Sequence, residues 1–206
     1  MTRLRVGVLA SGAGTNLQAI LDRVHGHEAE VVAVGSDKPG AEALGRALAL
    51  GIDTADFPRD AYPDREARDI AIAEWLVSRD VELVVLAGYM QLVSSAFLAA
   101  FPLRVINVHP ALLPAFPGIH AVEQALDYGV KVFGVTVHFV DEGIDSGPII
   151  LQQAIELPEA TDPAEVREAL RPIEHELLTG AVRLIASGTV RPDPSHPRRV
   201  LVGGTP

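Results

Sequence analysis

Residues 4–18 read LRVGVLASGAGTNLQ and contain the turn that decides the fold. The apolar, valine-containing start predicts a strand over 4–10, and a helix is expected over 16–24. Glycines 12 and 14 lie in the short turn between them. A strand that passes directly into a helix is typical of α/β proteins, which are built on a parallel sheet.

The same alternation continues through the first two thirds of the chain. Residues 84–86 (Val-Val-Leu) form a continuous apolar run, as expected of a strand that helices cover on both faces. The fold class predicted is therefore α/β, a mostly parallel twisted sheet with helices on both faces. Strands are expected over 4–10, 31–35, 54–57, 83–87, 105–108 and 132–140. Helices are expected over 16–24, 41–50, 64–78, 94–100 and 119–128.

The last third departs from this regular alternation. The segment 132–140 is long and follows Gly129, so it predicts an antiparallel strand added near the sheet edge. A loop over 141–148 and an apolar segment over 149–154 come next. The final helix has a start signal in Asp162, Pro163 and Glu165. Pro172 predicts a kink or break within that helix, and the chain after residue 188 is expected to be a peripheral tail.

The composition excludes several classes of protein. The 206 residues are 48% hydrophobic and carry a formal net charge of -10, and they include no cysteine. Disulfides and thiolate chemistry are therefore excluded, and an acidic chain without clustered Lys and Arg is poorly suited to nucleic acid. The apolar run at 6–10 is too short for a membrane helix or signal peptide. We expect a cytoplasmic protein with no membrane partner.

The glycine turn predicts an anion site with two alternatives. Gly14, Thr15 and Asn16 lie at a helix N-terminus, where free N–H groups and the helix dipole favour a phosphate. A dinucleotide site is the first alternative, because Asp37 follows the second strand where a ribose-binding acid stands in such folds. However, Leu17 occupies the place of a third glycine. The second alternative is a tight turn without a ligand.

The stretch 106–114, INVHPALLP, places an amide and an imidazole at a strand end. Residues two apart on a strand face the same side, so Asn107 and His109 are expected to converge. Ligands of open parallel sheets bind beyond this end. An amide donor beside an imidazole can stabilise an oxyanion and move a proton during acyl transfer. The alternative is a polar strand end that the loop backbone satisfies.

The acidic loop after residue 140 offers partners for that imidazole. A carboxylate from Asp141, Glu142 or Asp145 beside His109 would raise the imidazole pKa and orient the ring. The spacing does not distinguish the three acids, and all three could instead be solvated.

Other polar residues fit no short motif. His109, His120 and His138 lack the spacing of a zinc site, so no metal is expected. Arg171 and Glu174 are i,i+3 neighbours if helical, either as a surface ion pair or as a phosphate cation with a sugar-binding acid. Arg65 alone reads as a surface arginine.

Four motifs together resemble the glycinamide ribonucleotide formyltransferase family, over about residues 5–190. They are 11–18 (SGAGTNLQ), 86–90 (LAGYM), 107–114 (NVHPALLP), and 137–140 (VHFV) running to 145–148 (DSGP). The resemblance implies a Rossmann-like formyltransferase fold and transfer of a formyl group from 10-formyltetrahydrofolate, a co-substrate, to glycinamide ribonucleotide. It also implies a role in purine biosynthesis, with small-molecule substrates and no nucleic acid.

By this resemblance, the site residues fall into three groups. The catalytic group is Asn107, His109 and Asp145. The ribonucleotide group is Gly14, Thr15, Asn16, Arg171 and Glu174. The folate group is Arg65, Met90, Gln91, Leu92, Val93, Asn107, Asp141, Glu142, Gly143, Ile144 and Asp145. Three positions depart from common members: Gln91 replaces a frequent arginine, Tyr89 a frequent phenylalanine, and Arg171 a lysine or glutamine. Gln91 therefore leaves side-chain contacts to the folate tail open.

The resemblance also implies a domain organisation. One formyltransferase domain is expected over 1–190, with a nucleotide-binding half at 1–105 and a catalytic and folate half at 106–190. Residues 191–206 are expected to be a peripheral C-terminal tail, and the protein a monomer or homodimer. The alternatives are another formyl-folate enzyme, such as a deformylase or methionyl-tRNA formyltransferase, a non-catalytic nucleotide-binding module, or a nicotinamide-dependent oxidoreductase.

Overall fold

The structure is a computed structural model that describes residues 3–196 and 198–203. Its contacts divide the chain into two compact units, Met1–Asn107 and Val108–Pro206. The boundary falls within a single strand, so the first unit contributes one part of that strand and the second unit contributes the other.

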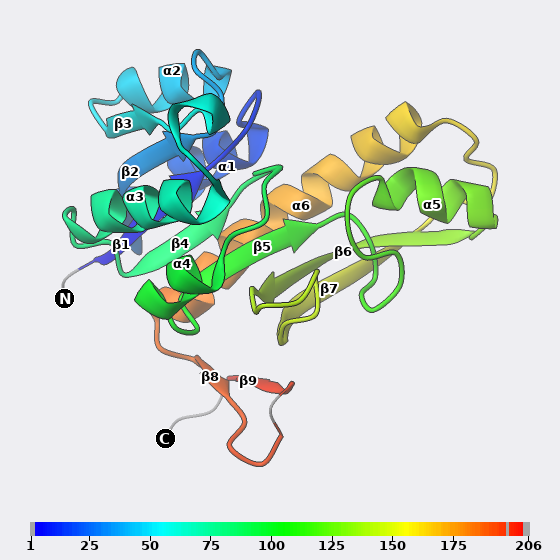
Figure 1. Cartoon of the computed structure of the whole chain (residues 1–206). Coiled ribbons are helices and arrows are strands. Elements are labelled where there is room, and N and C mark those ends of the chain that lie inside the picture. Colours follow the sequence, from blue (N-terminus) through cyan, green and yellow to red (C-terminus); the bar gives the residue numbers. More distant parts are fainter. Residues whose placement is uncertain (1–2, 197, 204–206) are drawn as a thin grey trace. The chain divides into compact units, whose positions relative to one another are not determined.

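The first unit is a parallel sheet that begins at the N-terminus (Figure 1). Its strand order is β3-β2-β1-β4-β5, and these neighbouring strands pair in parallel. Leu9 at the end of β1 lies beside Gly35 and Leu86, so the carboxyl ends of these strands share one edge. The strands are β1 (Leu4–Leu9), β2 (Ala29–Ser36), β3 (Asp53–Asp56), β4 (Leu83–Leu86) and the start of β5 (Val105–His109).

Four helices connect these strands. The connections through α1 and α2 move outward along the sheet to β3, whereas the connection through α3 returns to β4 on the other side of β1. Because such crossovers are right-handed, α3 belongs on the face opposite α1 and α2. Contacts of α1 with α2 and of α3 with α4 agree with two layers. The helices are α1 (Thr15–Arg23), α2 (Glu42–Leu48), α3 (Arg65–Val77) and α4 (Ser95–Ala100), with a 3-10 turn η1 (Arg59–Ala61) before α3.

Polar side chains fix where two of these helices begin. Asp64 accepts a hydrogen bond from the Ala67 N–H at 2.8 Å, and Ser94 accepts one from the Phe97 N–H at 3.3 Å. Each side chain satisfies a backbone donor that has no partner within its own helix. These caps fix the first turn of α3 and of α4.

The second unit continues from β5 into an antiparallel pair. Its sheet order is β5-β6-β7, and β6 pairs antiparallel with β7 from Val132 opposite Glu156 to His138 opposite Ile149. The predicted α/β class, mostly parallel with an antiparallel strand after the Asn–His region, is confirmed. The elements are β6 (Val132–Phe139), β7 (Ile149–Glu156), α5 (Ala121–Tyr128) and α6 (Pro163–Ala186).

Of the kink or break predicted at Pro172, the break is wrong, because α6 continues through this residue. Pro172 is exposed, so water can hydrate the carbonyl that the missing N–H leaves free. The buried neighbours Leu170 and Ile173 lie on the packed face and hold both turns in place. Asp162 caps the helix, as predicted, by accepting from the Ala164 N–H at 2.9 Å.

The chain after residue 188, predicted only as a peripheral tail, contains regular secondary structure. It forms a hairpin of β8 (Val190–Pro192) and β9 (Val200–Val202), and β9 contacts β7. The N–H of Gly203 donates to the Thr189 carbonyl at 3.1 Å and closes the base of the hairpin. Within the described residues, no helix is long and apolar enough to cross a membrane.

Candidate active site

The end of β5 carries the two residues that the sequence singled out. Asn107 and His109 are two residues apart on this strand, so their side chains leave the same face. Asn107 is partly exposed, whereas only 6% of the His109 side chain is exposed. The strand therefore presents a reachable amide beside a sheltered imidazole.

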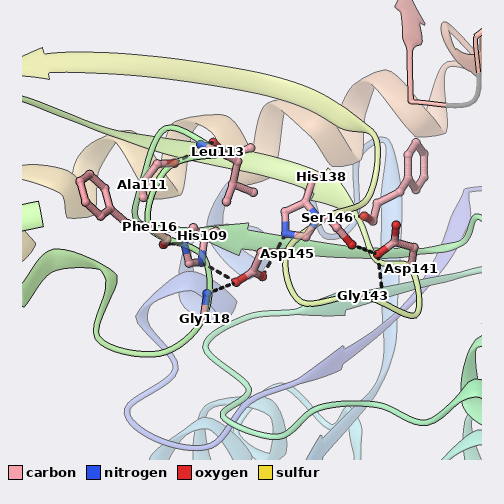
Figure 2. Close-up of polar contacts among 12 residues, drawn as sticks. His109, Ala111, Leu113, Phe116, Gly118, His138, Asp141, Gly143, Asp145 and Ser146 are labelled. Carbon is pink, nitrogen blue, oxygen red and sulfur yellow. Dashed lines mark hydrogen bonds and ion pairs between the residues drawn. The ribbon is translucent and has the colours of Figure 1, made fainter. Parts of the chain in front are cut away.

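Both ring nitrogens of His109 face an oxygen atom (Figure 2). Nε2 lies 2.8 Å from the carbonyl oxygen of Phe116, and Nδ1 lies 3.3 Å from Oδ2 of Asp145. A neutral ring has only one N–H and can satisfy only one of these acceptors, whereas the protonated ring can donate to both. The geometry orients the ring and gives its charged form a full set of partners.

Asp145 is the centre of this cluster. Its Oδ2 also accepts a hydrogen bond from the Gly118 N–H at 2.7 Å, and its Oδ1 lies 3.5 Å from Nε2 of His138. The side chain of Asp145 is 14% exposed. Figure 2 shows the carboxylate between the two imidazoles, with the Gly118 backbone on the His109 side. One carboxylate thus couples a strand end, a loop and a second strand.

His138 is a member of the cluster that the sequence reasoning considered only as a zinc candidate. It lies in β6, 1% exposed, and its Nδ1 is 2.8 Å from the Phe139 carbonyl. Its signal was present in the VHFV motif at 137–140, where an imidazole on a buried strand requires a polar partner. We place it beside Asp145 as a residue that positions the carboxylate.

The electrostatics of the cluster pull in two directions. Burial lowers the pKa of His109 below its ordinary value, while the Asp145 carboxylate and the Phe116 carbonyl raise it. The expected upward effect of a carboxylate on the His109 pKa is present, but desolvation outweighs it and the net shift is downward. The pKa of Asp145 is lowered to about 2: burial raises it, but hydrogen bonds from His138 and Gly118 and the charge of His109 lower it more.

The other two loop acids have different surroundings. Oδ1 of Asp141 accepts hydrogen bonds within its own turn, from the Gly143 N–H at 3.1 Å and the Ser146 hydroxyl at 2.7 Å. Glu142 is exposed. Of the three candidates in this loop, Asp145 is the one that lies against His109.

The glycine turn before α1 has a backbone conformation and packing that only glycine allows. Gly14 has a left-handed φ of 72° at the N-cap of α1, and a Cβ there would lie 2.8 Å from the Cα of Ala43. Both conditions require glycine. Arg46, which the sequence analysis missed, donates from Nε to the Ala13 carbonyl at 2.7 Å and braces the turn. Thr15 and Asn16 follow as the first residues of the helix.

The structure does not favour the dinucleotide alternative, because Asp37, its expected ribose-binding acid, is buried. Asp37 is 8% exposed, and both of its oxygens accept hydrogen bonds inside the protein. The Ser11 hydroxyl donates to Oδ1 at 2.5 Å, and the Gln91 side-chain amide donates to Oδ2 at 3.0 Å. These partners already use the carboxylate that a ribose would require.

Several predicted folate positions line one hollow of about 540 Å³ in the first unit. Arg65 at the start of α3 lies on it with Met90, Gln91 and Leu92. Met90 and Leu92 are 60% and 54% exposed, which is unusual for large apolar side chains and is suited to covering an apolar ligand. Arg59 and Tyr62, which the sequence reasoning missed, lie on the same hollow. Val93 is not among the lining residues.

The remaining predicted residues lie on the second unit. Gly143 and Ile144 are part of the loop between β6 and β7, which also carries Asp145. Arg171 is on α6, where its Nη1 lies 2.9 Å from Glu168, a different acid from the expected Glu174. Glu174 lies one turn further along the same helix. Among the described residues, no group of three or more histidine or acidic side chains is arranged to hold a metal ion.

Comparison with known proteins shows the family to which the chain belongs. The model of the formyl transferase family matches residues 4–182. The chain belongs to this formyl transferase family. It is 42% identical over 181 residues to a phosphoribosylglycinamide formyltransferase of Bacillus subtilis, covering 87% of the chain and 93% of that protein.

Two further formyl transferase relatives show the range of the similarity. The crystal structure of glycinamide ribonucleotide transformylase 1 from Symbiobacterium toebii matches with a TM-score of 0.92 and 48% identity, over 97% of this chain and 94% of that one. The human trifunctional purine biosynthetic protein adenosine-3 is 40% identical over 191 residues, which cover 92% of this chain and 19% of that protein. The similarity therefore extends to a much longer protein of purine biosynthesis.

Proposed function

We propose that the protein transfers the formyl group of 10-formyltetrahydrofolate to the amine of glycinamide ribonucleotide in de novo purine biosynthesis. The products are formylglycinamide ribonucleotide and tetrahydrofolate. The names of the relatives support glycinamide ribonucleotide formylation, and the family supports a folate-derived formyl donor. The observation that carries the proposal is the His109 ring held between Phe116 and Asp145 beside Asn107.

The reaction requires stabilisation of a negative oxygen. The substrate amine attacks the formyl carbon, a new N–C bond forms, and the carbonyl oxygen gains negative charge in a tetrahedral intermediate. Asn107 donates a hydrogen bond to this oxygen from its side-chain amide, and His109 donates from Nε2, which exchanges the Phe116 carbonyl for the oxyanion while Nδ1 stays on Asp145. A preorganised donor of this kind lowers the activation barrier by roughly 2.7–4 kcal/mol.

The His109 pKa suits a ring that becomes charged during the reaction. Burial disfavours the imidazolium in the resting protein, but the developing oxyanion adds a second negative charge beside Asp145 and favours it. The proton that the attacking amine must lose can therefore move to His109 as the intermediate forms. It then passes to the folate nitrogen as the C–N bond to the folate breaks, which balances the transfer.

The ligands are assigned to the remaining predicted residues. We assign the ribonucleotide to Gly14, Thr15 and Asn16, whose backbone would take the phosphate, and to Arg171 and Glu174. We assign the folate to Arg65, to the segment Met90, Gln91, Leu92 and Val93, and to the loop from Asp141 to Asp145. We further propose a cytoplasmic enzyme, active as a monomer or homodimer.

An assay with both substrates tests the proposed function. The purified protein should form formylglycinamide ribonucleotide from 10-formyltetrahydrofolate only when glycinamide ribonucleotide is present. Release of formate without the ribonucleotide would instead identify a deformylase. Absence of any folate turnover, together with tight binding of the ribonucleotide, would identify a non-catalytic binding module and refute the proposal.

A further inference from the structure

The segment from Met90 to Ser94 is fastened from inside the protein at three points. The Met90 N–H donates to the Ser11 hydroxyl at 2.8 Å, the Gln91 side chain is bonded on both sides, and the Ser94 N–H donates to Asp69 at 2.7 Å. We call the groups that make these bonds the anchoring network: the side chains of Ser11, Asp37, Arg68, Asp69 and Gln91, with the backbone N–H of Ser94.

Gln91 connects the two halves of the anchoring network. Its amide nitrogen donates to Oδ2 of Asp37 at 3.0 Å, and its amide oxygen accepts from Nη1 of Arg68 at 3.4 Å. Asp37 in turn accepts from Ser11 at 2.5 Å. Only an uncharged side chain with both a donor and an acceptor fits between a carboxylate and a guanidinium in this way.

The deep half of the network is an ion pair. Arg68 and Asp69 are 1% and 0% exposed, and Nε and Nη2 of Arg68 lie 3.3 and 3.1 Å from the same oxygen of Asp69. The other oxygen of Asp69 accepts from the Ser94 N–H. Because a buried ion pair holds its geometry only when its remaining polar atoms are satisfied, Gln91 completes the partners of Arg68.

We infer that Gln91 is a positioning residue, which holds the main chain of residues 90–93 in the form that binds folate, and that its side chain is not itself a ligand. The inference rests on the proposed function. Both ends of the Gln91 amide are used within the protein, while its neighbours Met90 and Leu92 project outward on the hollow. Glutamine stands here in place of the arginine that is frequent in the family, and Asp37 and Arg68 supply the partners for its amide.

Substitution of Gln91 tests this role by separating the two substrates. Gln91→Ala should raise KM for 10-formyltetrahydrofolate about tenfold, as expected for loss of hydrogen bonds to charged groups. The KM for glycinamide ribonucleotide and kcat should stay within about twofold of the wild-type values. Residues 90–93 are assigned neither to ribonucleotide binding nor to the chemical step. Amide hydrogen exchange at Met90 should become faster, and this readout requires no activity.

A second variant adds a pH signature. In Gln91→Glu, the ionised carboxylate cannot donate to Asp37 and repels it, whereas the protonated form regains a donor in the same place. The charged groups that face this position are Asp37, Asp69 and Arg68, and the Tyr89 hydroxyl stays neutral across this pH range because burial raises its pKa. The folate KM of the variant, divided by that of the wild type, should therefore fall as the pH is lowered from about 8 to about 6. Gln153→Glu is the control, since Gln153 is exposed and its side chain has no hydrogen bond among the described residues.

The outcomes distinguish this inference from the proposed function. An active wild type whose Gln91→Ala variant keeps its folate KM within twofold, with unchanged exchange at Met90, overturns the positioning role alone. A wild type without formyl transfer overturns the proposed function, and Met90 exchange then still reports on the anchoring. A folate KM ratio for Gln91→Glu that does not change with pH also overturns the role of Gln91.

Discussion

Two buried polar clusters, one in each unit, both set carboxylates against nitrogen donors, but their chemistry differs. The anchoring network surrounds Asp37 and Asp69 with Arg68 and Gln91, and the cluster around Asp145 surrounds it with His109 and His138. In both, carboxylates face nitrogen donors in a nearly closed interior. The difference is that a guanidinium and an amide hold their protons at any working pH, whereas an imidazole exchanges its proton near neutrality.

This difference suits the anchoring network to holding a chain segment in place and the Asp145 cluster to proton transfer. A network whose protonation is fixed keeps one geometry, which suits a chain segment that must present its backbone to a ligand. The Asp145 cluster instead sets burial against neighbouring charge at His109, so a small change beside the ring changes its protonation. The comparison predicts that damage to the first cluster appears as lost stability and folate affinity, and damage to the second as lost turnover.

Removal of the guanidinium should produce the largest effect. Arg68→Met should lower the free energy of unfolding by about 3–5 kcal/mol, because Asp69 is left buried with its charge uncompensated. Urea denaturation measures this, with the exposed Arg198→Met as the control. A loss below about 1 kcal/mol would mean that the network does not hold the segment by its charges.

At the end of β5, substitutions should reduce turnover and leave the protein folded. Asn107→Ala and His109→Ala should each lower kcat by at least about a hundredfold, through loss of a donor to the oxyanion, while circular dichroism stays that of the folded protein. The exposed His27→Ala is the matched control. Near-normal turnover in either variant would remove that residue from the proposed chemistry.

The sequence predicted most of the fold because its signals are local. The strands and helices of the first unit follow from apolar runs and caps, such as Asp64 and Ser94 before their helices. The β8–β9 hairpin escaped prediction, since strands of three residues show no measurable alternation. The continuity of α6 also escaped, because the packing of Leu170 and Ile173, which holds both turns around Pro172, is a tertiary feature.

The candidate site was predictable only where one element carries it. Asn107 and His109 share a strand, so their convergence follows from its period of two. The selection of Asp145 over Asp141 depends on how a loop returns to β5, and spacing does not contain that information. The anchoring network joins residues 11, 37, 68 and 91, and only the tertiary fold brings these together.

The substitution Asp145→Asn sharpens the comparison most directly, because it removes charge while keeping shape. Asp145 raises the pKa of His109 against the effect of burial, so the variant should show a still lower His109 pKa. An NMR titration of the imidazole measures this shift. An unchanged or higher His109 pKa would show that the Phe116 carbonyl and burial alone set the ring's protonation.

The same variant has a smaller signature in acid stability, with a definite sign. The folded pKa of Asp145, about 2, lies below its ordinary 3.8, so the carboxylate stabilises the folded protein above about pH 4. That contribution, about 2 kcal/mol, is lost as the pH falls from about 4 to about 2. The stability difference between wild type and Asp145→Asn should therefore shrink across this interval. A difference that stays constant would mean that the carboxylate acts through shape, and the contrast between a fixed network and a titrating one would then fail at its central residue.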